Sequence, residues 1–387
     1  MGTYMQQATL LWHVSLLAPP GQKGLALGLV GLVRVIPIVL FSMVAGVAAD
    51  AFDRRRLMLA TQCGAAVVAS LLAWLAFRGV DELWPVYLLA AVAGSVAAFD
   101  PPARHSLVPM LVPRAQLPNA INLNSTVMQM ASVVGPAVGG LIIASHGVAW
   151  AYMVNTTAAL SVVVALLLMR DVPPRDGPAA RDMFSVASAL TGLRFVFRTP
   201  IIRSTMLLDF FATFFASALA LLPIVAQDIL KVGPQGYGLL AAAPAAGAVT
   251  ASLLMLPLTP RLTRHGTILI VAVIGYGLAT VVFGVSRSFW PAMICLALVG
   301  ASDSVSTIIR NLIRQLETPD EMRGRMMGVN MVFFQGGPQL GELEAGLVAQ
   351  WIGAGPSVVL GGLGCLAATA AITFLTPTLW HYTARRD

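Results

Sequence analysis

The chain has 387 residues, of which 57% are hydrophobic and only 11% charged, and its mean hydropathy is +0.81. Soluble domains carry about 25% charged residues, so this composition excludes an ordinary soluble protein and predicts an all-α polytopic membrane protein. The net charge of +7 does not indicate a nucleic-acid partner, because the arginines lie in short loops and form no continuous basic face.

Apolar runs long enough to cross a bilayer recur twelve times along the chain. The first six predicted spans fall near residues 2–18, 24–49, 57–77, 84–103, 118–144 and 148–169. The second six fall near 201–227, 236–258, 267–285, 289–312, 325–352 and 356–379. We therefore predict an N-terminal six-helix bundle over 1–170, a cytoplasmic linker over 171–200 and a C-terminal six-helix bundle over 201–387.

The linker is the only long polar stretch. Its Pro-rich, charged beginning is expected to be irregular, whereas residues 184–197 have the spacing of an amphipathic helix at the membrane surface. With both termini inside, the inner loops and tail hold nineteen basic residues, all arginines. The outer loops hold four, which are Lys23, Arg78, Lys231 and Arg287. This asymmetry predicts that both termini are cytoplasmic.

The two sets of six spans repeat one another. At an offset of 206 residues the matched pairs are Arg104 with Arg310, Pro113 with Pro319, Asn124 with Asn330, Gly135 with Gly341 and Gly140 with Gly346. At an offset of 210 residues the pairs are Gly28 with Gly238 and Arg54 with Arg264. Two parallel six-span halves related by a pseudo-twofold axis are typical of alternating-access transporters.

The first predicted span is shorter than its counterpart, the seventh, by roughly ten residues. We expect the first helix to be truncated here and the intact protein to begin upstream of Met1. A short, tilted first span is the alternative.

The run GVAADAFDRRRL, residues 46–57, closes the second predicted span. Gly46 permits close helix approach, and Asp50 stands where a carboxylate can face a helix N-terminus or an arginine. Arg54 and Arg55 follow at once. The run is either a stop that only fixes orientation or a short loop that also acts as a gate.

The fifth predicted span contains Gly135, Pro136, Gly139 and Gly140. The proline removes a backbone donor, and the glycines permit tight packing between helices. A functional bend between the two halves and plain close packing are both compatible with this motif.

Charged residues within spans are costly and point to function. Those selected here are Arg34, Asp209, Asp303, Arg310, Glu342 and Glu344. Asp303 and Arg310 are seven residues apart on one predicted helix, so they share a face and can pair.

Several of these motifs resemble the major facilitator superfamily. The loop signature of that family is usually G-x-x-x-D-R-x-G-R-R, and here Ala51 replaces the basic residue and Asp53 the glycine. The GP-x-x-GG run of the fifth span resembles the signature of its drug and proton antiporters. DPPARHSLVP at 100–109 and the segment from ASDSVSTIIRN to LGELEAG resemble the macrolide-efflux and enterobactin-exporter-like branch. The fourth span, LLAAVAGSVAAFD, lacks the arginine that many proton antiporters carry there.

The resemblance extends over the chain from about Gly2 and implies the major facilitator fold. It implies that Asp50 latches the two halves in the outward-facing state. It also implies contact between spans two and eleven, so Arg34 is expected to pair with Glu342 or Glu344 and close the outer side, or else to form a static ion pair.

The same fold lines its central cavity with spans one, four, seven and ten, which brings in Asp209 and Asp303. We favour Asp209 for coupling, because we expect Arg310 to neutralise Asp303.

These features predict a secondary-active transporter, driven by an ion gradient, that exports an amphipathic small molecule of the drug, macrolide or siderophore class by alternating access. An importer and a transport-inactive truncated relative are the alternatives. No HExxH, GxSxG, His cluster or P-loop is present, so an enzyme is not expected. We expect protons and the lipid bilayer as partners, no nucleic acid, no cofactor and no metal. A monomer in the bacterial inner membrane, with a cytoplasmic C-terminus, completes the prediction.

Overall fold

The structure is a computed structural model that describes residues 1–19, 21–51, 53–107, 112–113, 116–169, 186–258 and 262–383. For residues 42–51 and 54, among others, it describes the backbone alone. These described ranges contain helices and no strand. The chain divides into two compact units. Unit 1 comprises Met1–Pro20, Val30–Arg181 and Gly233–Ala242, and unit 2 comprises Gly21–Leu29, Asp182–Val232 and Ala243–Asp387.

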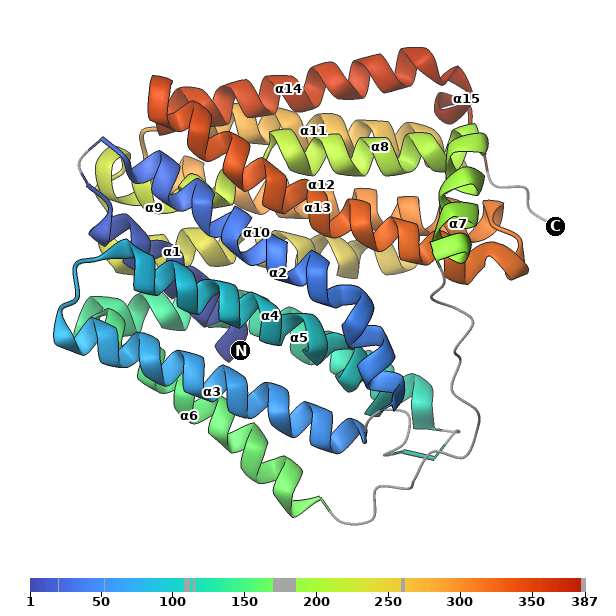
Figure 1. Cartoon of the computed structure of the whole chain (residues 1–387). Helices are drawn as coiled ribbons and strands as arrows, with labels where there is room; N and C mark the ends of the chain where they lie inside the picture. Colours follow the sequence, from blue (N-terminus) through green and yellow to red (C-terminus); the bar gives the residue numbers. More distant parts are fainter. Residues whose placement is uncertain are drawn as a thin grey trace. The chain divides into compact units, whose positions relative to one another are not determined.

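The first six predicted spans match six helices, with ends that differ by a few residues (Figure 1). These are α1 (Gly2–Leu17), α2 (Lys23–Ala51), α3 (Arg54–Arg78), α4 (Leu83–Leu107), α5 (Leu117–His146) and α6 (Val148–Leu168). The ends of α3 follow from its sequence. The Asp53 carboxylate accepts the Arg56 amide at 2.9 Å, and Gly79 closes the helix in the left-handed region at φ 63°.

The amphipathic helix expected over 184–197 is α7 (Val186–Arg198). The long helices of the second half are α8 (Pro200–Phe215), α10 (Gly233–Leu258), α11 (His265–Val285), α12 (Phe289–Glu317), α13 (Asp320–Ile352) and α14 (Ala354–Leu375). A short helix, α15 (Pro377–Trp380), follows α14.

The span predicted over 201–227 agrees with the candidate membrane span Pro200–Ile229, but it is not one regular α-helix. After α8 the chain forms a 3₁₀ turn (Ala218–Leu221), the short α9 (Leu222–Ile224) and a π-helical turn (Val225–Ile229). Side-chain hydrogen bonds tie the break to neighbouring helices, and a backbone group freed within a membrane needs such a partner. The Ser217 hydroxyl lies 2.7 Å from the Thr213 carbonyl oxygen and 3.1 Å from that of Pro338, and the Tyr276 hydroxyl donates to the Ala216 carbonyl at 3.3 Å.

Ten helices among the described residues are long and apolar enough to cross a membrane. α1 has 16 residues, fewer than the ~20 that a bilayer core requires, and α13 contains Glu342 and Glu344. Large apolar side chains are exposed, among them Trp351 and Phe374, as expected of surfaces that face lipid.

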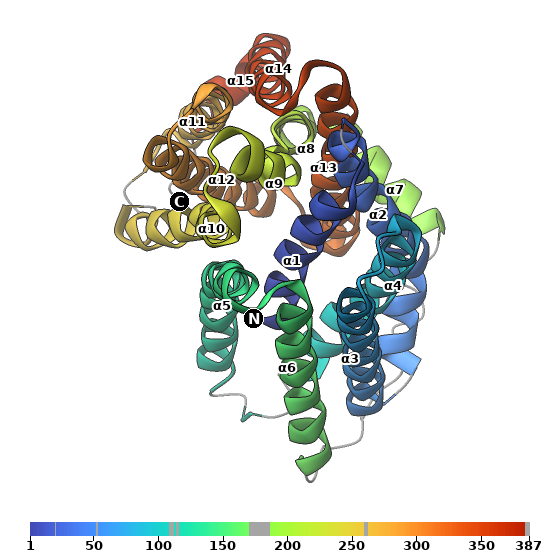
Figure 2. The ribbon, with the colours of Figure 1, turned by 90° about the vertical axis from the view of Figure 1, so that its left-hand side faces the viewer.

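Each unit has its own helix packing. In unit 1, α3 packs against α4 and α6, and α1 packs against α5 and α6 (Figure 2). In unit 2, α11 packs against α12 and α14, and α8 packs against α13 and α14. The core of unit 2 beneath α8 includes Leu208, Ala212 and Ile309, directly beside the charged residues described next.

Candidate functional site

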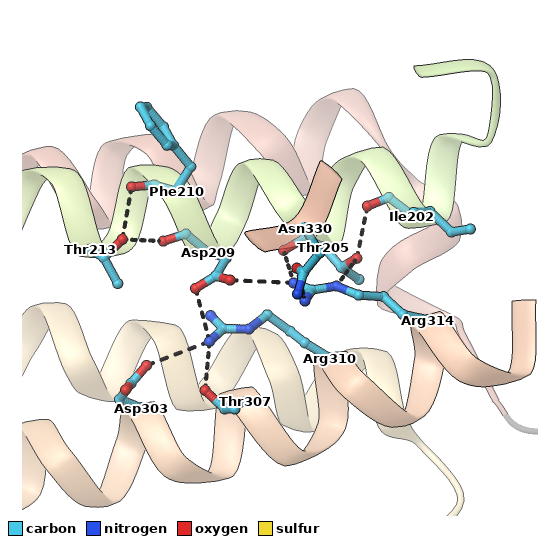
Figure 3. A network of polar contacts seen from close by, with 10 residues as sticks. All are labelled: Ile202, Thr205, Asp209, Phe210, Thr213, Asp303, Thr307, Arg310, Arg314 and Asn330. Atoms are coloured by element: carbon cyan, nitrogen blue, oxygen red, sulfur yellow. Dashed lines mark hydrogen bonds and ion pairs between the residues drawn. The ribbon is translucent and has the colours of Figure 1, made fainter. Parts of the chain in front are cut away.

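A buried cluster of charges in unit 2 is centred on Asp209 of α8 (Figure 3). Asp209 is 1% exposed. The Arg310 Nη2 atom lies 3.0 Å from its Oδ1, and the Arg314 Nη2 atom lies 3.4 Å from its Oδ2. The two arginines are one helical turn apart on α12, so both point at the same carboxylate.

Arg310 has a second acidic partner on its own helix. Its Nη2 atom lies 3.6 Å from Asp303 Oδ1 and donates to the Thr307 hydroxyl at 2.7 Å. The Asp303 side chain is 46% exposed, whereas that of Arg310 is 3% exposed. The pairing of Asp303 with Arg310 agrees with its predicted helix spacing. The preference for Asp209 as the coupling group assumed that Arg310 pairs with Asp303, whereas Arg310 lies closer to Asp209 than to Asp303.

Arg314 connects three helices of unit 2. It donates to the Asn330 side-chain oxygen on α13, and its Nε lies 3.4 Å from the Thr205 hydroxyl on α8. Arg310 and Arg314 are two of the nineteen basic residues counted on the inner side from the sequence, and both are buried within α12. Without these two, seventeen basic residues remain on the predicted inner side against four on the outer side. The charge asymmetry therefore still predicts cytoplasmic termini.

The charges of this cluster balance, with two carboxylates against two guanidinium groups. Taking an ion out of water costs several kcal/mol, and the attraction between partners offsets that cost only if each charge is paired and hydrogen-bonded. Asp209 is paired with two arginines, and its Oδ2 accepts a hydrogen bond from Arg314 at 3.4 Å. Asp303, held by one ion-pair contact at 3.6 Å, is the most exposed of the four charged side chains, at 46%.

The loop motif after α2 is described only in part. The backbone of Gly46 and Asp50 lies in α2, but the side chains of Asp50 and Arg54 lie outside the described residues, so the gate remains a prediction. Arg55 donates from Nε to the Leu166 carbonyl at 2.7 Å and from Nη2 to the Leu167 carbonyl at 3.0 Å. It therefore caps the C-terminal end of α6.

The glycines of the fifth-span motif make close helix contacts within unit 1. A Cβ atom at Gly135 would lie 3.0 Å from the Tyr4 Cβ, and one at Gly139 would lie 2.9 Å from the Met5 Cγ, both on α1. Pro136 lies inside α5. Close packing is thus a property of this motif, and the functional bend remains a prediction.

Gly140 makes a contact that the internal repeat reproduces. A Cβ at Gly140 would lie 2.6 Å from the Cα of Gly238, which brings α5 and α10 together in unit 1. In unit 2, a Cβ at Gly346 would lie 2.6 Å from the Cα of Gly28, which brings α13 and α2 together. Gly140 matches Gly346 and Gly238 matches Gly28 in the repeat, so matched residues make matched contacts.

The predicted partners Arg34 and Glu342 or Glu344 belong to different units, and their pairing remains a prediction. A polar contact of unit 2 lies at the start of α2. The Lys23 Nζ atom lies 3.0 Å from Asp228 Oδ1 and donates to the Gln227 side-chain oxygen at 3.2 Å.

Comparison with known proteins identifies the family. Residues 1–383 match the family model of a transmembrane secretion effector. The chain belongs to this family of the major facilitator superfamily. It is 27% identical over 366 residues to the enterobactin exporter EntS of Escherichia coli K12, across 93% of this chain and 85% of the exporter. The enterobactin exporter of Escherichia coli O1:K1 / APEC is 29% identical over 313 residues, across 80% of this chain and 72% of the exporter.

Solved structures show the same fold. A bacterial homolog of the human lysosomal transporter Spinster, in an inward-facing and unoccupied conformation, has a TM-score of 0.76 at 14% identity and covers 98% of this chain and 95% of its own. A D-xylose–proton symporter has a TM-score of 0.73 at 12% identity, with 99% and 97% covered. These likenesses confirm the predicted fold, and with the family they make this major facilitator protein a multi-pass secondary transporter.

Proposed function

We propose that this transporter exports an amphipathic small molecule of the siderophore or drug class, and that the proton gradient drives it. The similarity to enterobactin exporters supports this direction and substrate class. The observation that supports proton coupling is that Arg310 contacts both the buried Asp209 and the half-exposed Asp303.

The proposed coupling group is Asp303. When Asp303 is ionised, Arg310 interacts with two carboxylates and the cluster is neutral. When Asp303 binds a proton, its carboxyl group no longer attracts Arg310, which then pairs with Asp209 alone, and the cluster carries one positive charge. Proton binding therefore shifts the equilibrium between two transporter conformations only if one of them stabilises this positive charge better than the other.

The remaining assignments follow the same proposal. The protein works as a monomer in the bacterial inner membrane, with its C-terminus in the cytoplasm, and has no enzymatic activity. Asp50 with Arg54 and Arg55 gates the cytoplasmic side, and Arg34 with Glu342 or Glu344 closes the outer side. Import and an inactive transporter are not favoured, because the two sequence relatives named above are enterobactin exporters.

The experiment is complementation of an Escherichia coli strain that lacks EntS. Enterobactin in the culture medium is measured by chromatography, and resistance to a panel of macrolides and dyes is scored in an efflux-deficient strain, with and without a protonophore. We expect secretion or resistance that the protonophore abolishes. Resistance that persists with the protonophore contradicts proton coupling.

Asp303→Asn tests the coupling group. The side chain is half exposed, so the variant is expected to fold and to reach the membrane but to lose protonophore-sensitive transport. Asp228→Asn is the matched control, because it also removes an exposed carboxylate from an ion pair of unit 2. Full protonophore-sensitive transport by Asp303→Asn would assign the proton to another residue.

A further inference from the structure

The face of α7 that points away from unit 2 combines apolar and basic side chains. Leu190, Leu193 and Phe197 are exposed and lie on one stripe of the helix. Arg194 and Arg198 are exposed on the adjoining stripe, one turn apart. A helix with an exposed apolar stripe beside a basic one fits the boundary between acyl chains and headgroups.

The opposite face of α7 is fixed to the rest of unit 2. A Cβ atom at Gly192 would lie 2.8 Å from the Arg325 carbonyl oxygen, so α7 touches the first turns of α13 at backbone distance. Val196 is buried in a cluster with Met326 and Val329 of α13. Figure 1 shows α7 running across the ends of α8 and α13. A helix placed across the ends of membrane-spanning helices lies parallel to the membrane surface.

This end of unit 2 is strongly basic. Its arginines on α7, α8 and α13 are Arg194, Arg198, Arg203, Arg323 and Arg325. Among the acidic side chains described nearby, Glu321 is exposed, and the Glu317 carboxylate accepts the Tyr382 hydroxyl at 2.8 Å. The arginines outnumber these carboxylates, so the local charge favours an anionic partner.

We infer that α7 is a binding surface for anionic phospholipids of the inner leaflet. Arg194 and Arg198 contact the phosphate groups, and Leu190, Leu193 and Phe197 insert between the upper acyl chains. The inference goes beyond the transport function, and it rests on the proposed cytoplasmic position of α7. Basic residues at a membrane surface act through the negative charge of the lipids, so zwitterionic lipids should bind this surface less tightly.

The bound lipid would also be linked to the charge cluster. Val329 of α13 belongs to the hydrophobic cluster that buries Val196 of α7. The next residue, Asn330, accepts a hydrogen bond from Arg314. A headgroup that restrains α7 therefore restrains the helix that holds one side of the Asp209 cluster.

The test is native mass spectrometry of the full-length protein, delipidated in detergent and titrated with phosphatidylglycerol or phosphatidylcholine. Wild type is expected to retain phosphatidylglycerol preferentially. Arg194→Gln with Arg198→Gln should weaken this binding by about fivefold for each arginine removed. Arg78→Gln with Arg287→Gln is the matched control, since it removes two arginines from loops predicted to lie outside.

The outcomes separate clearly. Unchanged phosphatidylglycerol binding in the Arg194/Arg198 double variant, or an equal loss in the control, would overturn the proposal. Leu193→Ser with Phe197→Ser tests the apolar stripe independently and should weaken the binding of both lipids. Because these readouts need no transported substrate, they can fail or succeed separately from the proposed export function.

Discussion

Asp209→Asn tests whether the stability of unit 2 depends on the balance of positive and negative charge in the buried cluster. The substitution keeps the shape of the side chain but removes one of two carboxylates, which leaves two arginines and only Asp303, 46% exposed and paired with Arg310, in the cluster. Removing one partner of a buried pair costs about 3–5 kcal/mol. At about 2–4 °C per kcal/mol for a unit of 150–250 residues, the apparent melting temperature should fall by roughly 6–20 °C.

The assay is thermal unfolding of the purified protein in detergent, followed by size-exclusion chromatography. Asp228→Asn is the control, because that carboxylate is 49% exposed and an exposed pair contributes about 0–1 kcal/mol. The double variant Asp209→Asn with Arg314→Gln restores neutrality and should recover part of the loss. The reasoning is refuted if Asp209→Asn has the melting temperature of the wild type. It is also refuted if the double variant is no more stable than the single variant.

Two further predictions concern helix contacts and exposed charge. Gly140→Ala adds a Cβ atom 2.6 Å from the Gly238 Cα, so it should lower the melting temperature and reduce transport. Gly336→Ala is the control, because its Cβ would meet nothing within 4 Å, and it should change neither quantity. Equal effects of the two variants would refute the packing argument. Lys23→Gln breaks an exposed pair with Asp228 and should cost at most about 1 kcal/mol. That cost should shrink in high salt, which melting curves at two salt concentrations measure; a large loss independent of salt would contradict it.

Most of the fold could be predicted because a membrane span needs a long apolar run, and such runs are visible in one dimension. α7 was also predictable, since its apolar residues recur at helical spacing. The break after α8 was not. The break is contacted by Tyr276, which donates to the Ala216 carbonyl, and by Pro338, whose carbonyl accepts the Ser217 hydroxyl, and both contacts result from tertiary packing.

Part of the charge cluster could also be predicted from the sequence. Asp209, Asp303 and Arg310 stand out because ionised groups within apolar runs are costly. Arg314 was missed because the apolar run of α12 fades before the helix ends at Glu317. Its spacing of four residues from Arg310 was the available signal. Its partner Asn330 comes from another helix, and no local pattern indicates that contact.

The two repeated halves of the chain differ in the lengths of the matched helices α3 and α11. α3 has 25 residues and α11 has 21, and the repeat offset falls from 210 at Arg54 to 206 at Arg104 across this helix. Four residues make about one helical turn, or roughly 6 Å. Because residues four apart share a face, losing a whole turn leaves each helix presenting the same side to its neighbour, α6 for α3 and α14 for α11. The duplicated halves could therefore change length without rotating their packing surfaces.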